Sequence, residues 1–402
     1  MTETLEKTAE RLAFGTEIIN PKGGLLEKLK LAEKEKRPLR VKFGCDPTAP
    51  DLHLGHAVVF KKLRQFQDAG HTVVFIIGDG TTLIGDPSGR NATRPTLNPE
   101  TIKQNADTYF QQVGKLLDMS KVEVRYNSEW INKLDFVGMI HLAQQATVAQ
   151  LLVREDFGKR MKEEVPISLH ELLYPLVQAY DSWAIKADIE FGGTDQLFNN
   201  MMGRHLQERW EQPAQAVICM PLLRGLDGHD KMSKSKHNYI GITEAPEQMY
   251  GKAMSIPDAL LEEWTKLATD FTLDEKKAQI AQIAADPMGV KKTIAANIVA
   301  QYHGAGAVEA AAQHFYNNVQ NRDVLAKDYT PKILAELGLA ADGLTLLPLL
   351  KALAPDQSNG DLRRMVDGGG VALNGDKVTD INASVSLPVK LKMGKRGFFE
   401  VS

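Results

Sequence analysis

The sequence predicts an α/β protein in which a domain with a parallel sheet is followed by an all-helical domain and a small α+β domain. Apolar strands alternate with helical segments over roughly the first 240 residues, and strand patterns then stop. A short helix and a hairpin-like segment follow near the C-terminus. At about 150 residues per domain, a chain of 402 residues suits two or three domains. We therefore assign residues 1–240, 241–330 and 344–402 to three domains.

The first domain is predicted to begin with helices and a strand–helix–strand unit. Residues 2–36 are expected to be helical, and LRVKFGCD is a short strand that ends in a glycine turn. HTVVFIIGD is a continuous apolar strand of the kind that a parallel sheet buries on both faces. The crossover between these two strands should be right-handed. It is the helix at 54–69, whose apolar side contains Val58, Val59, Leu63 and Phe66.

Three more strands complete the predicted sheet, at VEVRYNS, ADIEFGGTDQ and AQAVICMPLL. Between the first two, residues 133–183 should be mostly helical, with SLHELLYPLVQAYDSWAI the clearest amphipathic piece. Residues 257–325 are expected to be all-helical, and residues 326–343 form a join rich in helix breakers. In the last domain, a helix in DLRRMVDGGG precedes VALNGDKV, which should turn as a hairpin at Asn374-Gly375.

The composition excludes several classes of protein. The chain is 43% hydrophobic and 25% charged, as in ordinary globular proteins, and no apolar run approaches the ~20 residues that span a bilayer. The N-terminus lacks an apolar signal core, and two distant cysteines form no disulfide framework, so we expect a cytoplasmic protein without a membrane partner. The net charge is −3, so any nucleic acid must bind a local patch. Residues 361–402 carry seven Lys/Arg and five Asp/Glu, a local balance of +2.

Two histidines, His53 and His56, lie in DLHLGH, where a parallel strand passes to a helix N-terminus. A zinc site would need further ligands, and no cysteine or histidine lies near enough in sequence to supply one. A purely structural helix start with half-exposed histidines is the other alternative. However, a helix N-terminus attracts anions, and positions i and i+3 share one face. Gly55 adds no side chain between the two rings, so a nucleotide could approach the backbone closely.

A second motif, KMSKS at residues 231–235, follows a buried strand about 175 residues later. By itself it could be a solvated surface loop. In order on one chain, HxGH and KMSKS resemble the signatures of class I aminoacyl-tRNA synthetases. The stretches GCDPTAPDLHLGH, LIGDPSGR, YPLVQAYDS and GGTDQ narrow the resemblance to bacterial tyrosyl-tRNA synthetases of the subgroup that contains KMSKS.

The resemblance covers most of the chain and implies a role for each domain. Residues 1–240 would form a Rossmann-like catalytic domain, with a helical insertion at about 120–165 at a homodimer interface. Residues 241–330 would form a helical anticodon-binding domain. Residues 344–402 would form a small RNA-binding domain like ribosomal protein S-four. There, adjacent Arg363 and Arg364 are candidates for binding tRNA(Tyr), although adjacent arginines often only solvate a helix.

The resemblance also implies which residues bind substrates. Tyr174, Gln178 and Asp181 fall at i, i+4 and i+7 on one helical face, with Asp181 at the phenol hydroxyl of L-tyrosine and the other two at its amino group. Without the resemblance, Tyr174 would be a plain core aromatic, and Asp86 a turn residue. The full set of candidate tyrosine-binding residues is Lys42, Gly44, Asp46, Thr81, Asp86, Tyr174, Gln178, Asp181 and Gln196. The candidate ATP-binding residues are His53, Gly55, His56, Gly193, Asp195, Lys231, Ser233, Lys234 and Ser235.

One position departs from the family pattern. Many tyrosyl enzymes have a tyrosine two residues before the first-strand glycine, and that tyrosine also contacts the substrate hydroxyl. This chain has Lys42 there, before Gly44. Recognition of the hydroxyl should therefore depend more on Asp181, which leaves the part played by Lys42 open.

The implied reaction joins tyrosine and ATP to give tyrosyl-adenylate and pyrophosphate, and then transfers tyrosine to tRNA. The candidate catalytic residues are His53, His56, Thr48, Lys231 and Lys234, which would position and stabilise the phosphates. Mg²⁺ would arrive with ATP, without a tightly bound protein metal. Two alternatives remain: another HxGH adenylyltransferase, and an RNA-binding scaffold that keeps a synthetase fold without activity.

Overall fold

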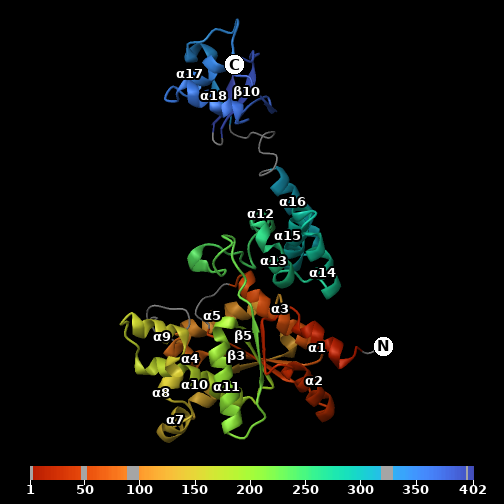
Figure 1. Ribbon diagram of the computed structural model, residues 1–402, viewed down its shortest axis with the longest axis vertical. Helices are drawn as coiled ribbons and strands as arrows, with labels where there is room; N and C mark the ends of the chain where they lie inside the picture. Colours follow the sequence, from red (N-terminus) through yellow and green to blue (C-terminus); the bar gives the residue numbers. More distant parts are fainter. Residues whose placement is uncertain (1–2, 47–51, 88–98, 318–328, 395–396) are drawn as a thin grey trace. The chain divides into compact units, whose positions relative to one another are not determined.

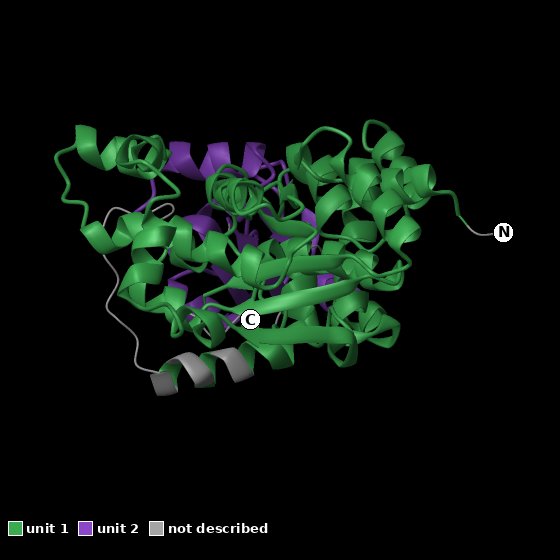
Figure 2. Ribbon diagram, turned by 90° about the horizontal axis from the view of Figure 1, so that it is seen from below, with its two compact units in different colours: residues 1–311 green, residues 312–402 purple. Residues whose placement is uncertain are grey.

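The computed structural model describes residues 3–46, 52–87, 99–317, 329–394 and 397–402 (Figure 1). The candidate catalytic residue Thr48 lies outside these ranges. The chain divides into two compact units, residues 1–311 and residues 312–402, which Figure 2 colours green and purple. Each unit is described by itself below.

A six-stranded sheet is the centre of unit 1. Its order is β1-β6-β5-β2-β3-β4, and all neighbours are parallel except β1, which pairs antiparallel with β6. The sequence predicted the five parallel strands. The strands are β1 (Ile18–Asn20), β2 (Arg40–Cys45), β3 (Thr72–Ile77), β4 (Val122–Tyr126), β5 (Ile189–Gly193) and β6 (Ala216–Met220).

Helices cover this sheet and connect its strands (Figure 1). The apolar face predicted for residues 54–69 is confirmed, since Val58, Leu63 and Phe66 of α3 are buried. Residues 2–36 are not all helical, because β1 separates α1 from α2. The main helices are α1 (Leu5–Ala13), α2 (Gly24–Glu35), α3 (Leu54–Asp68), α4 (Asp79–Ile84), α5 (Pro99–Val113), α6 (Ser128–Ile131), α7 (Phe136–Ala143), α8 (Val148–Leu152), α9 (Glu155–Lys162), α10 (Tyr174–Ala184) and α11 (Leu197–Arg209).

The rest of unit 1 is helical, as the sequence predicted for residues after 257. Trp264 is fully buried in this part and donates its indole N–H to the carbonyl of Arg224 at 3.2 Å. Among the described residues, no helix combines the length and apolar character needed to cross a bilayer. The helices are α12 (Pro246–Met254), α13 (Leu261–Leu267), α14 (Leu273–Gln282) and α15 (Pro287–His303), and α16 (Val308–Phe315) runs on into unit 2.

In unit 2 the structure describes a five-stranded sheet of order β7-β11-β10-β8-β9 together with the helices α17 and α18. The predicted hairpin is confirmed: β8 pairs antiparallel with β9 around Asn374 and Gly375, which both have positive φ. β7 pairs with β11 and lies in the segment that the sequence indicated as a join. The elements are β7 (Thr330–Lys332), α17 (Leu346–Leu353), α18 (Asn359–Asp367), β8 (Val371–Leu373), β9 (Asp376–Lys377), β10 (Val389–Met393) and β11 (Gly397–Val401).

Candidate active site

A cavity of about 490 Å³ opens at the carboxyl ends of the parallel strands of unit 1, where open α/β sheets bind ligands. The ends of β2, β3 and β5, the start of α3, one face of α10 and the KMSKS segment form its wall. The sequence-predicted residues that line it are Gly44, Asp46, His53, Gly55, His56, Thr81, Asp86, Tyr174, Gln178, Asp181, Gly193, Asp195, Gln196, Lys231 and Ser233.

The two histidines lie together at the start of α3. Their ring centroids are 3.8 Å apart, and the backbone N–H of His53 donates to Nδ1 of His56 at 3.3 Å. Because Nδ1 accepts, neutral His56 carries its proton on Nε2 and can donate from there. Nδ1 of His53 is buried and has no hydrogen-bond partner among the described residues. Nε2 of His56 is therefore the ring nitrogen that these contacts leave for a ligand in the pocket.

Both imidazoles are neutral at pH 7. Burial lowers the pKa of His53 to about 2, helped by repulsion from His56 and Lys234. The His56 residue is exposed where it lines the pocket, and desolvation lowers its pKa to about 4, with a further contribution from the charges of Lys234 and Lys231. The histidines can thus act as N–H donors, and they are unsuited to act as cations.

Backbone pairing brings the two motifs together, although about 175 residues separate them. His53 forms an antiparallel bridge with Gly241, and the N–H of Leu54 donates to the carbonyl of Ile240 at 3.0 Å. Gly55 makes this approach possible. A Cβ added to Gly55 would lie 3.0 Å from the His53 ring and 3.5 Å from Cβ of Met232, the second residue of KMSKS.

The lysines of KMSKS lie at the edge of the pocket. Lys231 is 53% exposed at its side chain and pairs with Asp195 at 3.1 Å, so the first lysine of the motif contacts a residue of GGTDQ. Lys234 and Ser235 follow in a short 3-10 helix and are not among the lining residues. The charge of Lys234 nevertheless lowers the pKa of both histidines, which places this lysine near them.

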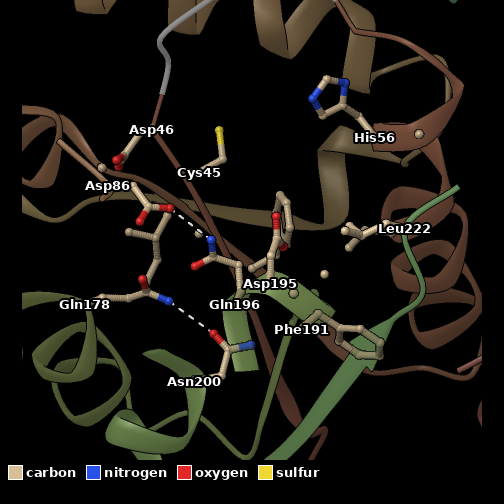
Figure 3. A pocket seen from close by; sticks show the side chains of 18 of the residues that line it. Cys45, Asp46, His56, Asp86, Gln178, Phe191, Asp195, Gln196, Asn200 and Leu222 are labelled. Carbon is tan, nitrogen blue, oxygen red and sulfur yellow. Dashed lines mark hydrogen bonds between the residues drawn. The ribbon is translucent and has the colours of Figure 1, made fainter. Parts of the chain in front are cut away.

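The opposite end of the pocket contains carboxylates and amides. Asp46 at the end of β2 accepts from Thr81 Oγ1 at 2.7 Å and from the Tyr174 hydroxyl at 2.9 Å. Gln196 donates to Asp86 at 2.9 Å, and Figure 3 shows this pair on the side of the pocket away from His56. Gly78 is needed here, because a Cβ would lie 2.1 Å from Asp46 Oδ1. These polar side chains are held in place by hydrogen bonds to one another.

Asp181 lines the pocket and is only 3% exposed. Its carboxylate accepts from the indole N–H of Trp130 at 2.7 Å and makes a longer contact with Asn127 at 3.5 Å. Burial raises the pKa of Asp181 to about 7, against the lowering effect of Lys42 and these two donors. A buried carboxylate in the wall of a cavity suits a ligand hydroxyl that donates a hydrogen bond.

Lys42 does not reach the cavity. Its side chain is fully buried behind the pocket wall, where Nζ lies 2.7 Å from Glu190 and 2.7 Å from the hydroxyl of Ser182. The sequence analysis named neither partner. A signal was present, because Lys42 and Glu190 are opposite charges in otherwise apolar strands.

Sequence reasoning also missed Asn127, Trp130 and Asn200. Asn127 follows β4 directly, so its position at a strand's carboxyl end could have indicated it. Trp130 and Asn200 have no comparable signal, since helix positions alone do not show which side faces a cavity. Arg363 and Arg364 lie in unit 2, exposed on α18, where Arg364 pairs with Asp361 at 2.5 Å. Among the described residues, no cluster of three or more His, Cys, Asp or Glu side chains is placed to hold a metal ion.

Comparison with known proteins identifies the family. The sequence model of tRNA synthetases class I (W and Y) matches residues 34–320. The chain belongs to this family. Class I synthetases of this family use ATP and bind tRNA. Two curated relatives match over nearly the whole length. Tyrosine–tRNA ligase 2 of Photorhabdus laumondii is 46% identical over all of both chains, and tyrosine–tRNA ligase of Geobacter metallireducens is 48% identical over 98% of each.

Solved structures of synthetases share the fold. The tyrosyl-tRNA synthetase of Archaeoglobus fulgidus, complexed with L-tyrosine, matches with a TM-score of 0.62 at 22% identity, over 77% of this chain and 99% of that one. A truncated mitochondrial tyrosyl-tRNA synthetase of Aspergillus nidulans matches with a TM-score of 0.63 at 20% identity, over 79% and 94%. The predicted α/β class with a Rossmann-like parallel sheet is confirmed.

Proposed function

We propose that this chain is a tyrosine–tRNA ligase, which activates L-tyrosine with ATP and transfers it to the 3′ end of tRNA(Tyr). One observation carries the proposal beyond the family. The cavity lined by the histidines of α3 and the KMSKS segment is also lined by Asp181, a buried acceptor held by Trp130. A carboxylate there suits an amino acid whose side chain ends in a hydrogen-bond donor, as the phenol hydroxyl of tyrosine does, and it disfavours the phenyl ring of phenylalanine, which has no donor.

Tyrosine binds with its ring along α10 and its hydroxyl donating to Asp181. Its amino group lies among Tyr174, Gln178 and Asp86, and Asp46 and Thr81 fix the Tyr174 hydroxyl. A site built to receive a hydroxyl rejects phenylalanine because the buried acceptor then loses the hydrogen bond that the hydroxyl would donate. Gly44 and Gln196 complete this end of the pocket.

The first reaction is attack of the tyrosine carboxylate on the α-phosphorus of ATP, with pyrophosphate as the leaving group. The carboxylate is already ionised, so the enzyme contributes positioning and electrostatic stabilisation, and no general base is needed. His53 and His56 donate N–H groups to the phosphates, and Lys231 and Lys234 supply positive charge. Asp195 and Gly193 contact the ribose, and Mg²⁺ binds with the phosphates of ATP.

The second reaction transfers tyrosine to the terminal adenosine of tRNA, and unit 2 contributes to holding that tRNA. Arg363 and Arg364 on α18 are exposed and suited to phosphate contacts. A chain that ends at residue 317 removes the whole of the sheet in unit 2. It should still form tyrosyl-adenylate and should charge tRNA poorly. Normal charging by this shortened chain would exclude unit 2 as a tRNA-binding module.

The enzyme acts as a homodimer through its helical insertion. Seven of the twelve exposed large apolar side chains among the described residues lie between residues 136 and 169, far more than that segment's share of the chain. Such a concentration favours a protein interface. They are Phe136, Val137, Ile140, Val148, Val153, Met161 and Leu169. Sedimentation of the wild-type protein should show a dimer. The double variant Phe136→Asp/Val153→Asp should sediment as a monomer, and a variant that still sediments as a dimer would contradict this interface.

The decisive experiment is ATP–pyrophosphate exchange over a panel of amino acids. Exchange should depend on tyrosine and be very weak with phenylalanine and tryptophan. Comparable exchange with phenylalanine would remove the tyrosine assignment, and no exchange with any amino acid would favour a scaffold without activity. Circular dichroism on the same sample establishes that the protein is folded.

A further inference from the structure

A buried ion pair lies directly behind the tyrosine end of the pocket. Lys42 and Glu190 face each other as register partners on the adjacent parallel strands β2 and β5, and their charged atoms are 2.7 Å apart. The two side chains are 0% and 2% exposed. Neither residue lines the cavity, so neither is placed to touch tyrosine.

The pair is bonded to the substrate-facing helix. Nζ of Lys42 donates to the carbonyl of Gln178 at 3.1 Å and to the hydroxyl of Ser182 at 2.7 Å, both on α10. Ser182 in turn donates to Glu190 at 2.9 Å, and Gln215 donates to the same carboxylate oxygen. The ion pair thus joins two strands of the sheet to the turns of α10 that carry Gln178 and Asp181.

A neighbouring glycine leaves space for this network. A Cβ on Gly203 of α11 would lie 2.7 Å from the Ser182 hydroxyl, 2.8 Å from Gln215 and 3.1 Å from Glu190. The polar groups are therefore enclosed on the side of α11 as well as on the side of the sheet. Enclosure and several hydrogen bonds restrict how these side chains can rearrange, which is what a positioning element requires.

We propose that Lys42 and Glu190 are positioning residues for tyrosine recognition, which hold Gln178 and Asp181 of α10 at the substrate and so determine the preference for tyrosine over phenylalanine. The inference rests on the proposed tyrosine activation. In this proposal Lys42 acts on tyrosine recognition through its hydrogen bonds to α10, and it does not contact the tyrosine hydroxyl. An ammonium group at this position also acts on Asp181 through its charge, because the two groups share a region with little water.

The charges around Asp181 make the inference testable by pH. Asp181 accepts most strongly from the phenol when it is ionised, and burial raises its pKa to about 7. Lys42 from β2 lowers that pKa and Glu190 from β5 raises it, while the neutral donors Trp130 and Asn127 lower it. Tyrosine affinity should fall at low pH as Asp181 becomes protonated, and we call this fall the acid limb. Removal of the Lys42 charge and removal of the Glu190 charge should shift the pH of this fall in opposite directions.

The first experiment compares full-length wild type with Lys42→Met/Glu190→Gln, which removes both charges together and leaves no unpaired ion in the core. The tyrosine dissociation constant should rise by about ten-fold or more, since small misplacements of a binding group have large effects. The KM for ATP should stay within about two-fold, and the ratio of kcat/KM for tyrosine over phenylalanine should fall by a similar ten-fold. Lys291→Met is the matched control, because Lys291 is 8% exposed, pairs with Asp258 at 2.6 Å and lies in α15.

The second experiment measures tyrosine binding against pH in single variants. Glu190→Gln should move the acid limb to lower pH, and Lys42→Met should move it to higher pH. Ser182→Ala removes one hydroxyl of the network; it should weaken tyrosine binding by a smaller factor, and it serves as the binding test if the charge variants do not fold. Opposite pH shifts with impaired tyrosine binding support the proposal.

Two results would overturn it. If folded variants melt at lower temperature but keep the wild-type tyrosine affinity, discrimination and pH profile, the pair only stabilises the core. If the wild type itself shows no tyrosine-dependent exchange, the proposed function fails first, and this inference fails with it. The Lys291→Met control separates a general loss of stability from a specific loss of tyrosine recognition.

Discussion

The two ends of the pocket differ in how their charged side chains are paired. At the tyrosine end, Asp181 is 3% exposed and bonded to Trp130, and Lys42 and Glu190 are enclosed behind it. At the phosphate end, Lys231 is 53% exposed, and its partner Asp195 is 34% exposed. One end is fixed by interior packing, whereas the other has cations held by exposed contacts.

This difference matches two tasks. Selection of an amino acid needs a buried acceptor whose position does not change, because only then does a missing hydroxyl leave a desolvated group unpaired. Stabilisation of phosphates needs positive charge that can approach as negative charge develops. Four changes test the contrast, in order of expected effect.

Asp181→Ala should have the largest effect, because it removes the acceptor at the tyrosine end. Truncation of one partner in a buried charged hydrogen bond costs about 4 kcal/mol, or roughly a thousand-fold in kcat/KM for tyrosine. ATP–pyrophosphate exchange measures this loss. An unchanged far-ultraviolet circular dichroism spectrum is the control for folding, and a folded variant with near-normal exchange would contradict the assigned role.

Lys234→Ala tests the phosphate end. It should slow adenylate formation by roughly 3 kcal/mol, or about a hundred-fold, and leave tyrosine affinity unchanged. Pre-steady-state kinetics separates the two quantities. Lys236→Ala is the matched control two residues away, since Lys236 is half exposed and pairs with Asp230. If Lys234→Ala weakens tyrosine binding and leaves the rate of adenylate formation unchanged, Lys234 does not act at the phosphate end as assigned.

The affinity for tyrosine should depend on pH through Asp181, at the tyrosine end of the pocket, and not through the histidines at the phosphate end. Because the pKa of Asp181 is raised to about 7, its ionised fraction falls from about nine-tenths at pH 8 to about one-tenth at pH 6. Tyrosine affinity should therefore fall about ten-fold over this range as pH is lowered. His53 and His56, with pKa values of about 2 and 4, stay neutral throughout. Tyrosine affinity can be measured by calorimetric titration at several pH values. An affinity that does not change between pH 8 and pH 6 would disprove the role of Asp181 ionisation.

Arg363→Ala/Arg364→Ala should have the smallest effect and should leave both ends of the pocket intact. Loss of two phosphate contacts should weaken tRNA binding several-fold and reduce the log–log salt slope by about one for each arginine. Filter binding at several salt concentrations measures the slope. An unaltered slope would show that these arginines only solvate α18.

The parallel sheet could be predicted from the sequence because its strands are continuous apolar runs, such as TVVFII in β3, in which every residue but the first is buried. β1 was missed because it has only three residues, and its pairing with β6, about 200 residues later, decides that it is a strand. The strand β7 was missed for the same reason, since it depends on β11.

Residues at strand ends were the easiest part of the site to predict. The histidines follow from the rule that ligands bind at the carboxyl ends of parallel strands, whereas Asp46 and Gly193, which also lie at strand ends, were predicted from the family resemblance. The orientation of Lys42 could not be predicted in this way. A lysine has a long stem that can reach either face, and only the register with Glu190 directs it away from the cavity.

The contact between Lys231 and Asp195 has a consequence for ionic strength. An exposed ion pair of this kind contributes about 1 kcal/mol at most, and dissolved salt screens it over about 8 Å under physiological conditions. The triphosphate of ATP carries several negative charges and can take the lysine from Asp195 at little cost. Added salt therefore weakens both the ion pair of Lys231 with Asp195 and the attraction of Lys231 to the triphosphate. The buried ion pair of Lys42 and Glu190 is shielded from dissolved ions.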